Sequence, residues 1–124
     1  MAKRVLSVGQ CYPDQSAITA FLQRQYSAEV QVAGTADEAM SMLFAGPFDL
    51  VLVNRIFDED GGSGLDFIKA AKGDAAIARI PMMLVSNYAD AQQRAADAGA
   101  EPGFGKAQLG SNEVAERLGT FLSE

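Results

Sequence analysis

The chain has 124 residues, of which 48% are hydrophobic and 21% charged, with a net charge of −6 and no histidine. This length and composition suit one domain, residues 1–124, with a hydrophobic core of its own. The acidic balance argues against nucleic acid as a partner, because neutralising phosphates requires clustered positive charge. The lack of histidine excludes Ser-His and Cys-His nucleophile pairs and the usual zinc sites.

The only cysteine, Cys11, permits no disulfide within the chain, which favours a reducing compartment. No apolar run approaches the roughly 20 residues that a membrane span needs. The first four residues lead into a short strand-like run rather than the long apolar segment of a signal peptide. We therefore expect a cytoplasmic protein without membrane contact. Because no basic residue adjoins it in sequence, Cys11 is expected to be buried and inert.

Five short apolar runs predict strands, at residues 5–8, 28–32, 50–53, 81–85 and 102–105. The third and fourth runs are apolar at nearly every position, as expected for parallel strands covered by helices on both faces. The fifth run is interrupted by glycine, which predicts a short and irregular strand.

Segments with helical period lie between and after these runs, at residues 14–26, 36–45, 65–72, 89–98 and from 112 onward. Thr35 and Glu38 form a capping-box pattern before the second helix, which is expected to bury Met40, Leu43 and Phe44. Ser111 is expected to cap the last helix. The fourth helix is rich in alanine, so it should bury little and be among the less stable elements.

Five strand–helix units predict an α/β flavodoxin-like (βα)5 fold, a doubly wound parallel sheet with strand order 2-1-3-4-5 in three layers. Functional residues in such sheets lie beyond the carboxyl ends of the strands, at the switch between strands one and three. The segments expected there are residues 9–13, 54–64, 86–87 and the surroundings of Lys106.

The segment FDEDGGSGLD, residues 57–66, follows the third predicted strand and is rich in acids and glycine. Carboxylates on a sharply turning loop are suitable calcium ligands, which makes Asp58 and Asp60 candidate metal ligands. The spacing does not meet the EF-hand pattern, because no glutamate closes a twelve-residue loop. The simpler interpretation is a mobile, solvated loop.

In its ordered set of short motifs, the chain resembles the receiver domains of two-component response regulators over essentially its whole length. The segments that carry the resemblance are residues 3–8 (KRVLSV), 48–54 (FDLVLVN), 81–87 (PMMLVSN), 98–100 (AGA) and 103–106 (GFGK). The resemblance implies a module of phosphorelay signal transduction. In such modules an aspartate accepts a phosphoryl group from a histidine kinase, and an acidic pair holds magnesium.

Carried over by position, the family's hydroxyl residue and lysine are Ser86 and Lys106, whereas the phosphoacceptor position is Asn54. The acidic-pair positions are Gly9 and Gln10. An amide is a poor nucleophile, and magnesium normally needs one or two carboxylates. The resemblance therefore implies a degenerate pseudo-receiver that is not an enzyme and needs no cofactor, magnesium included.

The retained residues also have simple structural roles open to them. We expect the Lys106 ammonium group to donate to the Asn54 side-chain oxygen or to a nearby carbonyl, with anion binding as the functional alternative. Ser86 is expected to satisfy backbone groups near a helix start. On strand five, Gly103 stands where the family usually has an aromatic switch residue.

The leading functional hypothesis is a module that binds other signalling proteins without aspartyl phosphorylation. The resemblance implies that partners would use the face formed by the fourth helix, the fifth strand and the fifth helix, residues 89–122. Two alternatives remain open at this point. One is a working phosphoacceptor at Asp58 or Asp60, and the other is a module that responds to a divalent cation.

Overall fold

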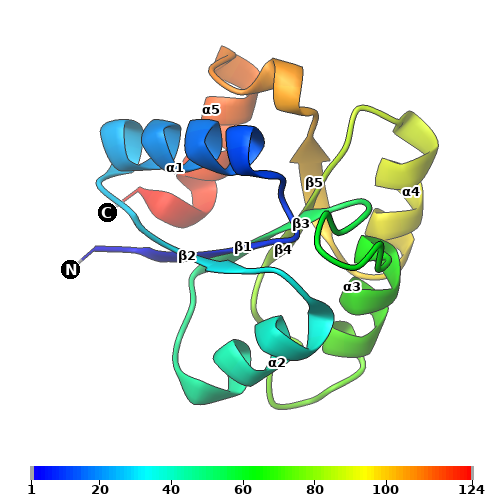
Figure 1. Ribbon diagram of the computed structural model, residues 1–124. Helices are drawn as coiled ribbons and strands as arrows, with labels where there is room; N and C mark the ends of the chain where they lie inside the picture. Colours follow the sequence, from blue (N-terminus) through cyan, green and yellow to red (C-terminus); the bar gives the residue numbers. More distant parts are fainter. Residues whose placement is uncertain (1, 124) are drawn as a thin grey trace.

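The computed structural model describes residues 2–123, in which five β-strands alternate with five α-helices (Figure 1). The strands are β1 (Arg4–Val8), β2 (Glu29–Ala33), β3 (Leu50–Asn54), β4 (Met82–Val85) and β5 (Glu101–Phe104). The helices are α1 (Tyr12–Tyr26), α2 (Ala36–Ala45), α3 (Gly64–Lys72), α4 (Ala89–Asp97) and α5 (Asn112–Leu122). A short 3-10 turn, η1 (Lys106–Gln108), follows β5.

The five strands form one parallel sheet in the order β2-β1-β3-β4-β5, which confirms the predicted flavodoxin-like (βα)5 topology. β3 is the central strand, and β1 lies between β2 and β3. The β4–β5 pairing is irregular, with a shift of register between Met83 and Val85. The carboxyl ends of β1, β3 and β4 therefore meet at one edge, and this edge carries the candidate site.

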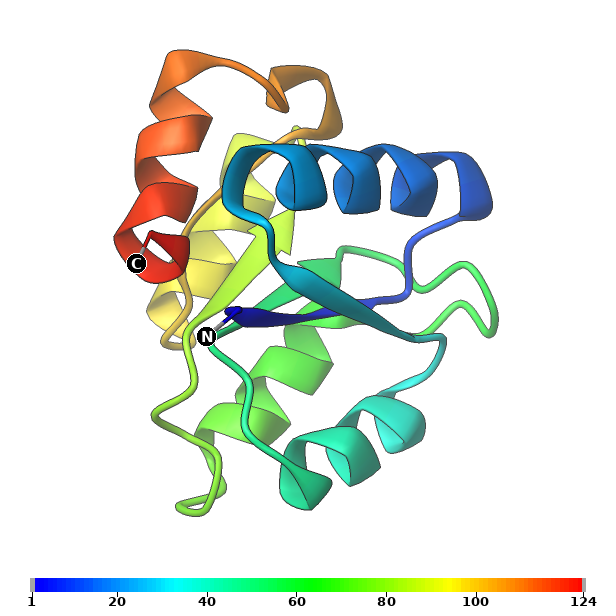
Figure 2. The ribbon, with the colours of Figure 1, turned by 90° about the vertical axis from the view of Figure 1, so that its left-hand side faces the viewer.

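Alternate residues of each central strand feed two separate hydrophobic cores, as the period of a strand requires. In β3, Val51 and Val53 belong to the core beneath α2, α3 and α4, whereas Leu50 and Leu52 belong to the core beneath α1 and α5. Figure 2 shows α1 and α5 on one side of the sheet and α2 and α3 on the other. This division explains why nearly every position of β3 and β4 is apolar.

Several sequence expectations for the helices hold. Thr35 Oγ1 accepts a hydrogen bond from the Glu38 amide, and the Glu38 carboxylate accepts one from Gly34, so the helix start is capped from both directions. Ser111 Oγ accepts a hydrogen bond from the Val114 amide at the start of α5. Both caps were readable from local sequence because their partners are within four residues.

Two expectations about the helices were wrong. Phe44 is 54% exposed, because α2 buries Ala39 and Leu43, and the next position points about 100° away around the helix axis. α1 begins at Tyr12 rather than at Asp14, with Pro13 inside its first turn. Asp14 lies in the first turn of α1, close to the site.

Strands β2 and β5 differ from their predicted ranges by one residue, as boundaries commonly do. Across residues 2–123, the structure contains no helix that combines the length and the apolar character needed to cross a membrane.

Candidate functional site at the carboxyl ends of the strands

Asn54, the last residue of β3, holds together the loops that follow β1 and β3. Its side-chain nitrogen Nδ2 donates to the carbonyl oxygen of Gly9 at 3.0 Å and to that of Ile56 at 2.7 Å. Carbonyl oxygens that converge in this way can also be ligands of a hard cation. Here the amide N–H groups satisfy both oxygens directly.

The ring of Phe57 lies directly against Gly9. A Cβ atom built on Gly9 would be 2.2 Å from Phe57 Cδ1, a distance that no real contact shows. Gly9 also has φ +76°, a left-handed conformation that side chains rarely adopt. Phe57 is 1% exposed and meets Phe67 edge to face, with ring centres 6.2 Å apart. The space where a side chain at position 9 would begin is therefore occupied by an aromatic ring.

The acidic loop after β3 is exposed at residues 58–61, as expected of a solvated loop, and its ends are joined by backbone hydrogen bonds. The Gly64 amide donates to Arg55 O at 2.8 Å, and the Phe57 amide donates to Gly62 O at 2.8 Å. These bonds close residues 55–64 into a small hairpin. Gly61 has φ +72° at its tip, a conformation that glycine adopts at no steric cost.

The carboxylates of this hairpin do not gather into a metal site. Asp58 and Asp60 are exposed, and Asp60 Oδ1 accepts a hydrogen bond from the Gly62 amide. Glu59 lies beside Gly34 at the end of β2. Within residues 2–123, no three acidic or cysteine side chains come together as a possible metal-binding group.

Lys106 pairs with Asp14, which sequence reasoning did not foresee. Its Nζ lies 2.6 Å from Asp14 Oδ2, and the Cys11 thiol donates to the same oxygen at 3.0 Å. The prediction that Lys106 contacts the Asn54 side-chain oxygen or a carbonyl was wrong, because the Asp14 carboxylate in the first turn of α1 takes the ammonium group instead. Cys11 is half-buried rather than fully buried. The Cys11 hydrogen bond and Lys106 lower the pKa of Asp14 below its ordinary value of 3.8.

We expect Lys106→Met to lower the free energy of unfolding at pH 7 by about 1 kcal/mol or less, because both side chains are partly exposed to solvent. The folded-state pKa of Asp14 is lowered, so the contribution of its ionised carboxylate to the free energy of unfolding is present above pH 3.8. This contribution is lost as the pH falls through the folded-state pKa. The difference between variant and natural protein should therefore shrink below pH 3.8. Urea unfolding of both proteins at pH 7 and at pH 3 measures this difference in the free energy of unfolding. Lys69→Met, on an exposed position of α3, is the control, and a difference that persists unchanged at pH 3 would contradict the pairing.

Ser86, at the end of β4, is buried, and its Oγ accepts a hydrogen bond from the Tyr88 amide at 3.1 Å. The hydroxyl thus satisfies a backbone group at the entry to α4, as the structural interpretation of this serine predicted.

Comparison with solved structures places this arrangement among known folds. A candidate response regulator from Chloroflexus aurantiacus superposes with a TM-score of 0.86 at 17% identity, covering 100% of both chains. The signal receiver domain of a DNA-binding response regulator from Colwellia psychrerythraea gives 0.81 at 21% identity, covering 98% of this chain and 99% of that one. The chemotaxis protein CheY4 of Vibrio cholerae gives 0.75 at 17% identity, with 98% and 99% covered.

The chain has the fold of response-regulator receiver domains. No protein-family model matches the sequence, and the search of curated proteins likewise found no match.

The residues present at the receiver-fold site do not fit a magnesium ion. Gly9 and Gln10 supply no carboxylate, and Asn54 supplies an amide whose nitrogen already bonds two of the available carbonyl oxygens. Gln10 is buried, and its side-chain amide makes no hydrogen bond within residues 2–123, but an amide oxygen is neutral. Asp14 is paired with Lys106. Magnesium gives up its water reluctantly and normally requires carboxylate ligands.

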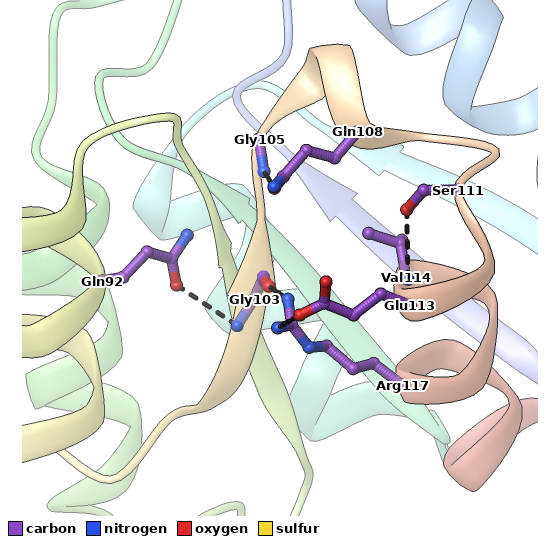
Figure 3. A network of polar contacts seen from close by, with 8 residues as sticks. All are labelled: Gln92, Gly103, Gly105, Gln108, Ser111, Glu113, Val114 and Arg117. Carbon is purple, nitrogen blue, oxygen red and sulfur yellow. Dashed lines mark hydrogen bonds and ion pairs between the residues drawn. The ribbon is translucent and has the colours of Figure 1, made fainter.

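Gly103 on β5, at the receiver fold's aromatic position, is held from both sides by long side chains (Figure 3). From α4, Gln92 Oε1 accepts from the Gly103 amide at 3.2 Å, and its Nε2 donates to Leu84 O and Ser86 O. From α5, Arg117 donates to Gly103 O at 2.6 Å and pairs with Glu113. A Cβ on Gly103 would be 2.1 Å from Leu84 O, so glycine is required for this close approach.

Gln92 fills the gap left by the irregular pairing of β4 and β5, a role that its sequence context did not indicate. We expect Gln92→Leu to lower the free energy of unfolding by about 2–3 kcal/mol, because it leaves two carbonyls and one N–H unpaired. Gln93→Leu is the matched control, since the exposed Gln93 bonds only Asp97 on the same helix. Urea unfolding and hydrogen exchange at the Gly103 amide measure the effect. Equal stability of the two variants would contradict this assignment.

Proposed function

We propose that this protein is a receiver-like signalling module that acts by binding other proteins and does not accept a phosphoryl group at residue 54. The observation that carries the proposal is the pair of hydrogen bonds from Asn54 Nδ2 to Gly9 O and Ile56 O. In this arrangement an amide takes the position of the acceptor carboxylate and bonds the oxygens that would face a cation.

Phosphoryl transfer to a receiver depends mainly on positioning and on neutralising the charge of the phosphoryl oxygens. The site described above has no carboxylate nucleophile at residue 54, and Phe57 occupies the space over Gly9. Lys106, at the position of the family's lysine, is engaged by Asp14. These features support a module without an enzymatic step and without a metal cofactor.

The partner surface that we propose is the face of α4, β5 and α5. Gln92 from α4 and Arg117 from α5 both hydrogen-bond Gly103 on β5 and so join the three elements. A face joined in this way suits recognition that does not depend on a phosphorylation-driven change of shape. We propose other signalling proteins as the partners, in a cytoplasmic setting.

Intact-mass measurement after incubation with acetyl phosphate and magnesium tests the proposal. The expected result is no phosphoryl adduct on the natural protein. A stoichiometric adduct that is lost in Asn54→Ala would overturn the proposal at residue 54. An adduct that survives in Asn54→Ala but disappears in Asp58→Asn or Asp60→Asn would establish the alternative acceptor in the hairpin.

A cation-responsive module is tested separately by thermal melting with calcium and with magnesium. We expect no rise in melting temperature at millimolar concentrations, because the exposed Asp58 and Asp60 form no metal-binding group with a third acidic side chain in residues 2–123. A rise that grows with the calcium concentration would support the cation hypothesis, since binding to the folded state stabilises it by mass action.

A further inference from the structure

A second cavity lies beside the receiver-fold site, between the hairpin after β3 and the helix α4. Its volume is about 370 Å³. The lining residues that matter here are Arg55, Ile56, Tyr88, Asp90 and Arg94. Ile56 is 45% exposed and Tyr88 is 58% exposed, so both offer apolar surface to a ligand in this cavity.

Two arginine side chains, Arg55 and Arg94, line this cavity. Neither Arg55 nor Arg94 takes part in an ion pair within residues 2–123. The guanidinium carbon of Arg55 lies 4.9 Å from the centre of the Tyr88 ring, so the two planar groups are held together. The cavity thus carries two guanidinium groups against one carboxylate, Asp90, in a protein of net charge −6.

We propose that this cavity binds a nucleoside monophosphate. A guanidinium group presents a planar fork of N–H donors that matches the oxygens of a phosphate. The Arg55–Tyr88 pair offers a flat surface on which a base can stack, as bases do on aromatic rings and guanidinium planes. Arg94, on α4, is then the group that holds the phosphate.

The size and the charge of the cavity select among ligands of this class. Its volume falls near the lower end of the roughly 300–1,000 Å³ of small-molecule sites, which suits one nucleotide rather than a dinucleotide. Asp90 is an acceptor suited to the hydroxyl groups of a ribose. Its charge, added to the acidic balance of the whole chain, works against a triphosphate.

The inference rests on this cavity and does not depend on whether residue 54 can be phosphorylated. A smaller neighbouring cavity of about 210 Å³ shares Arg55, Ile56 and Tyr88 and includes Asn54 and Lys106. A ligand against Tyr88 therefore contacts the same loops that end β3 and β4. Ligand binding at this position is suited to supply the signal input that phosphorylation gives in other receivers.

Isothermal calorimetry and amide chemical shifts of the natural protein with AMP and with GMP test the proposal. We expect saturable binding of at least one nucleotide, with shifts concentrated in residues 55–57 and 88–94. Arg55→Gln and Arg94→Gln should each weaken binding by about tenfold or more, because each removes a charge-assisted contact. Arg24→Gln is the matched control, since Arg24 and Arg94 are both exposed arginines in the last turn of a helix.

Separate titrations with adenosine and with inorganic phosphate measure how tightly each half of AMP binds by itself. Binding of AMP that is much tighter than that of either fragment supports a nucleotide site. Phosphate that binds as tightly as AMP would overturn the nucleotide assignment, and so would the failure of both AMP and GMP to bind. Undiminished binding by both arginine variants would place the ligand elsewhere and overturn the proposal. Circular dichroism confirms that each variant is folded, and intact mass reports separately on phosphorylation.

Discussion

Replacing Gly9 with alanine is expected to lower the free energy of unfolding by about 3 kcal/mol or more. Two costs combine at this position. The left-handed φ of +76° strains any residue with a Cβ atom, and that atom would lie 2.2 Å from the Phe57 ring. Phe57 cannot move aside easily, because it is fully buried against Phe67. Urea unfolding of the two proteins measures the difference.

Gly61→Ala separates these two costs. Gly61 has φ +72°, but nothing lies within 4 Å of the position of its Cβ, so its replacement carries only the backbone strain of about 1–2 kcal/mol. A Gly9→Ala variant that loses no more stability than Gly61→Ala would show that the ring does not obstruct position 9. In a Phe57→Ala background, Gly9→Ala should cost about as much as Gly61→Ala. An aspartate at position 9 meets the same obstruction, so restoring an acidic pair requires moving this ring.

Asn54→Asp is expected to destabilise the protein at pH 7 by about 2–4 kcal/mol rather than to restore an acceptor. The substitution removes two N–H donors and puts carboxylate oxygens near Gly9 O and Ile56 O, which lie 3.0 and 2.7 Å from the present amide nitrogen. Repulsion from these carbonyl oxygens raises the pKa of the new carboxyl in the folded state.

The stability loss of Asn54→Asp is expected to depend on pH, in a direction set by the raised pKa of the new carboxyl. When the folded-state pKa of an acid is raised, the folded state holds its proton longer, so stability falls as the pH rises above the unfolded pKa of roughly 4. The loss should therefore be largest at pH 7 and should shrink towards pH 4, where the protonated carboxyl donates to one carbonyl. Asn54→Ala removes the same donors without adding charge and should lack this dependence. A variant that is as stable as the natural protein at pH 7 would contradict the role assigned to the Asn54 amide.

The positions that depart from the receiver pattern are connected by contacts within the chain. Asn54 bonds Gly9 O, the Phe57 ring covers Gly9, and Asp14 engages Lys106. At positions 9 and 54 the groups left without an acid are thus satisfied within the chain, whereas the buried Gln10 side chain makes no hydrogen bond within residues 2–123. Such mutual satisfaction is what a stable folded state needs at buried polar positions. It also means that single substitutions towards the receiver pattern are expected to cost stability.

The attachment of α4 to the rest of the protein relies on one polar side chain, Gln92, as well as on apolar burial. Its buried apolar contribution is Ala95, and Gln92 supplies three hydrogen bonds to the sheet. The sequence correctly indicated a helix that buries little. It gave no sign that an amide would anchor it, because the groups that Gln92 satisfies belong to a strand irregularity.

The amino-acid sequence by itself determined the fold and the strand order. Apolar runs at the period of a strand alternate with helical segments, and parallel connections of this kind are restricted in handedness. Caps such as Thr35 and Ser111 were readable because a cap involves residues within four positions of each other. Sequence also indicated which residues stand at the carboxyl ends of the strands.

Only the tertiary structure decided how the site residues interact. Lys106 and Asp14 are 92 positions apart, and Asn54 and Gly9 are 45 apart, so neither contact leaves a local pattern. Asp14 reaches Lys106 from the first turn of α1, and the hairpin after β3 places Phe57 over Gly9. The physical reason is that strand and helix periods follow from neighbouring residues. Contacts between loops depend instead on how the separate elements pack.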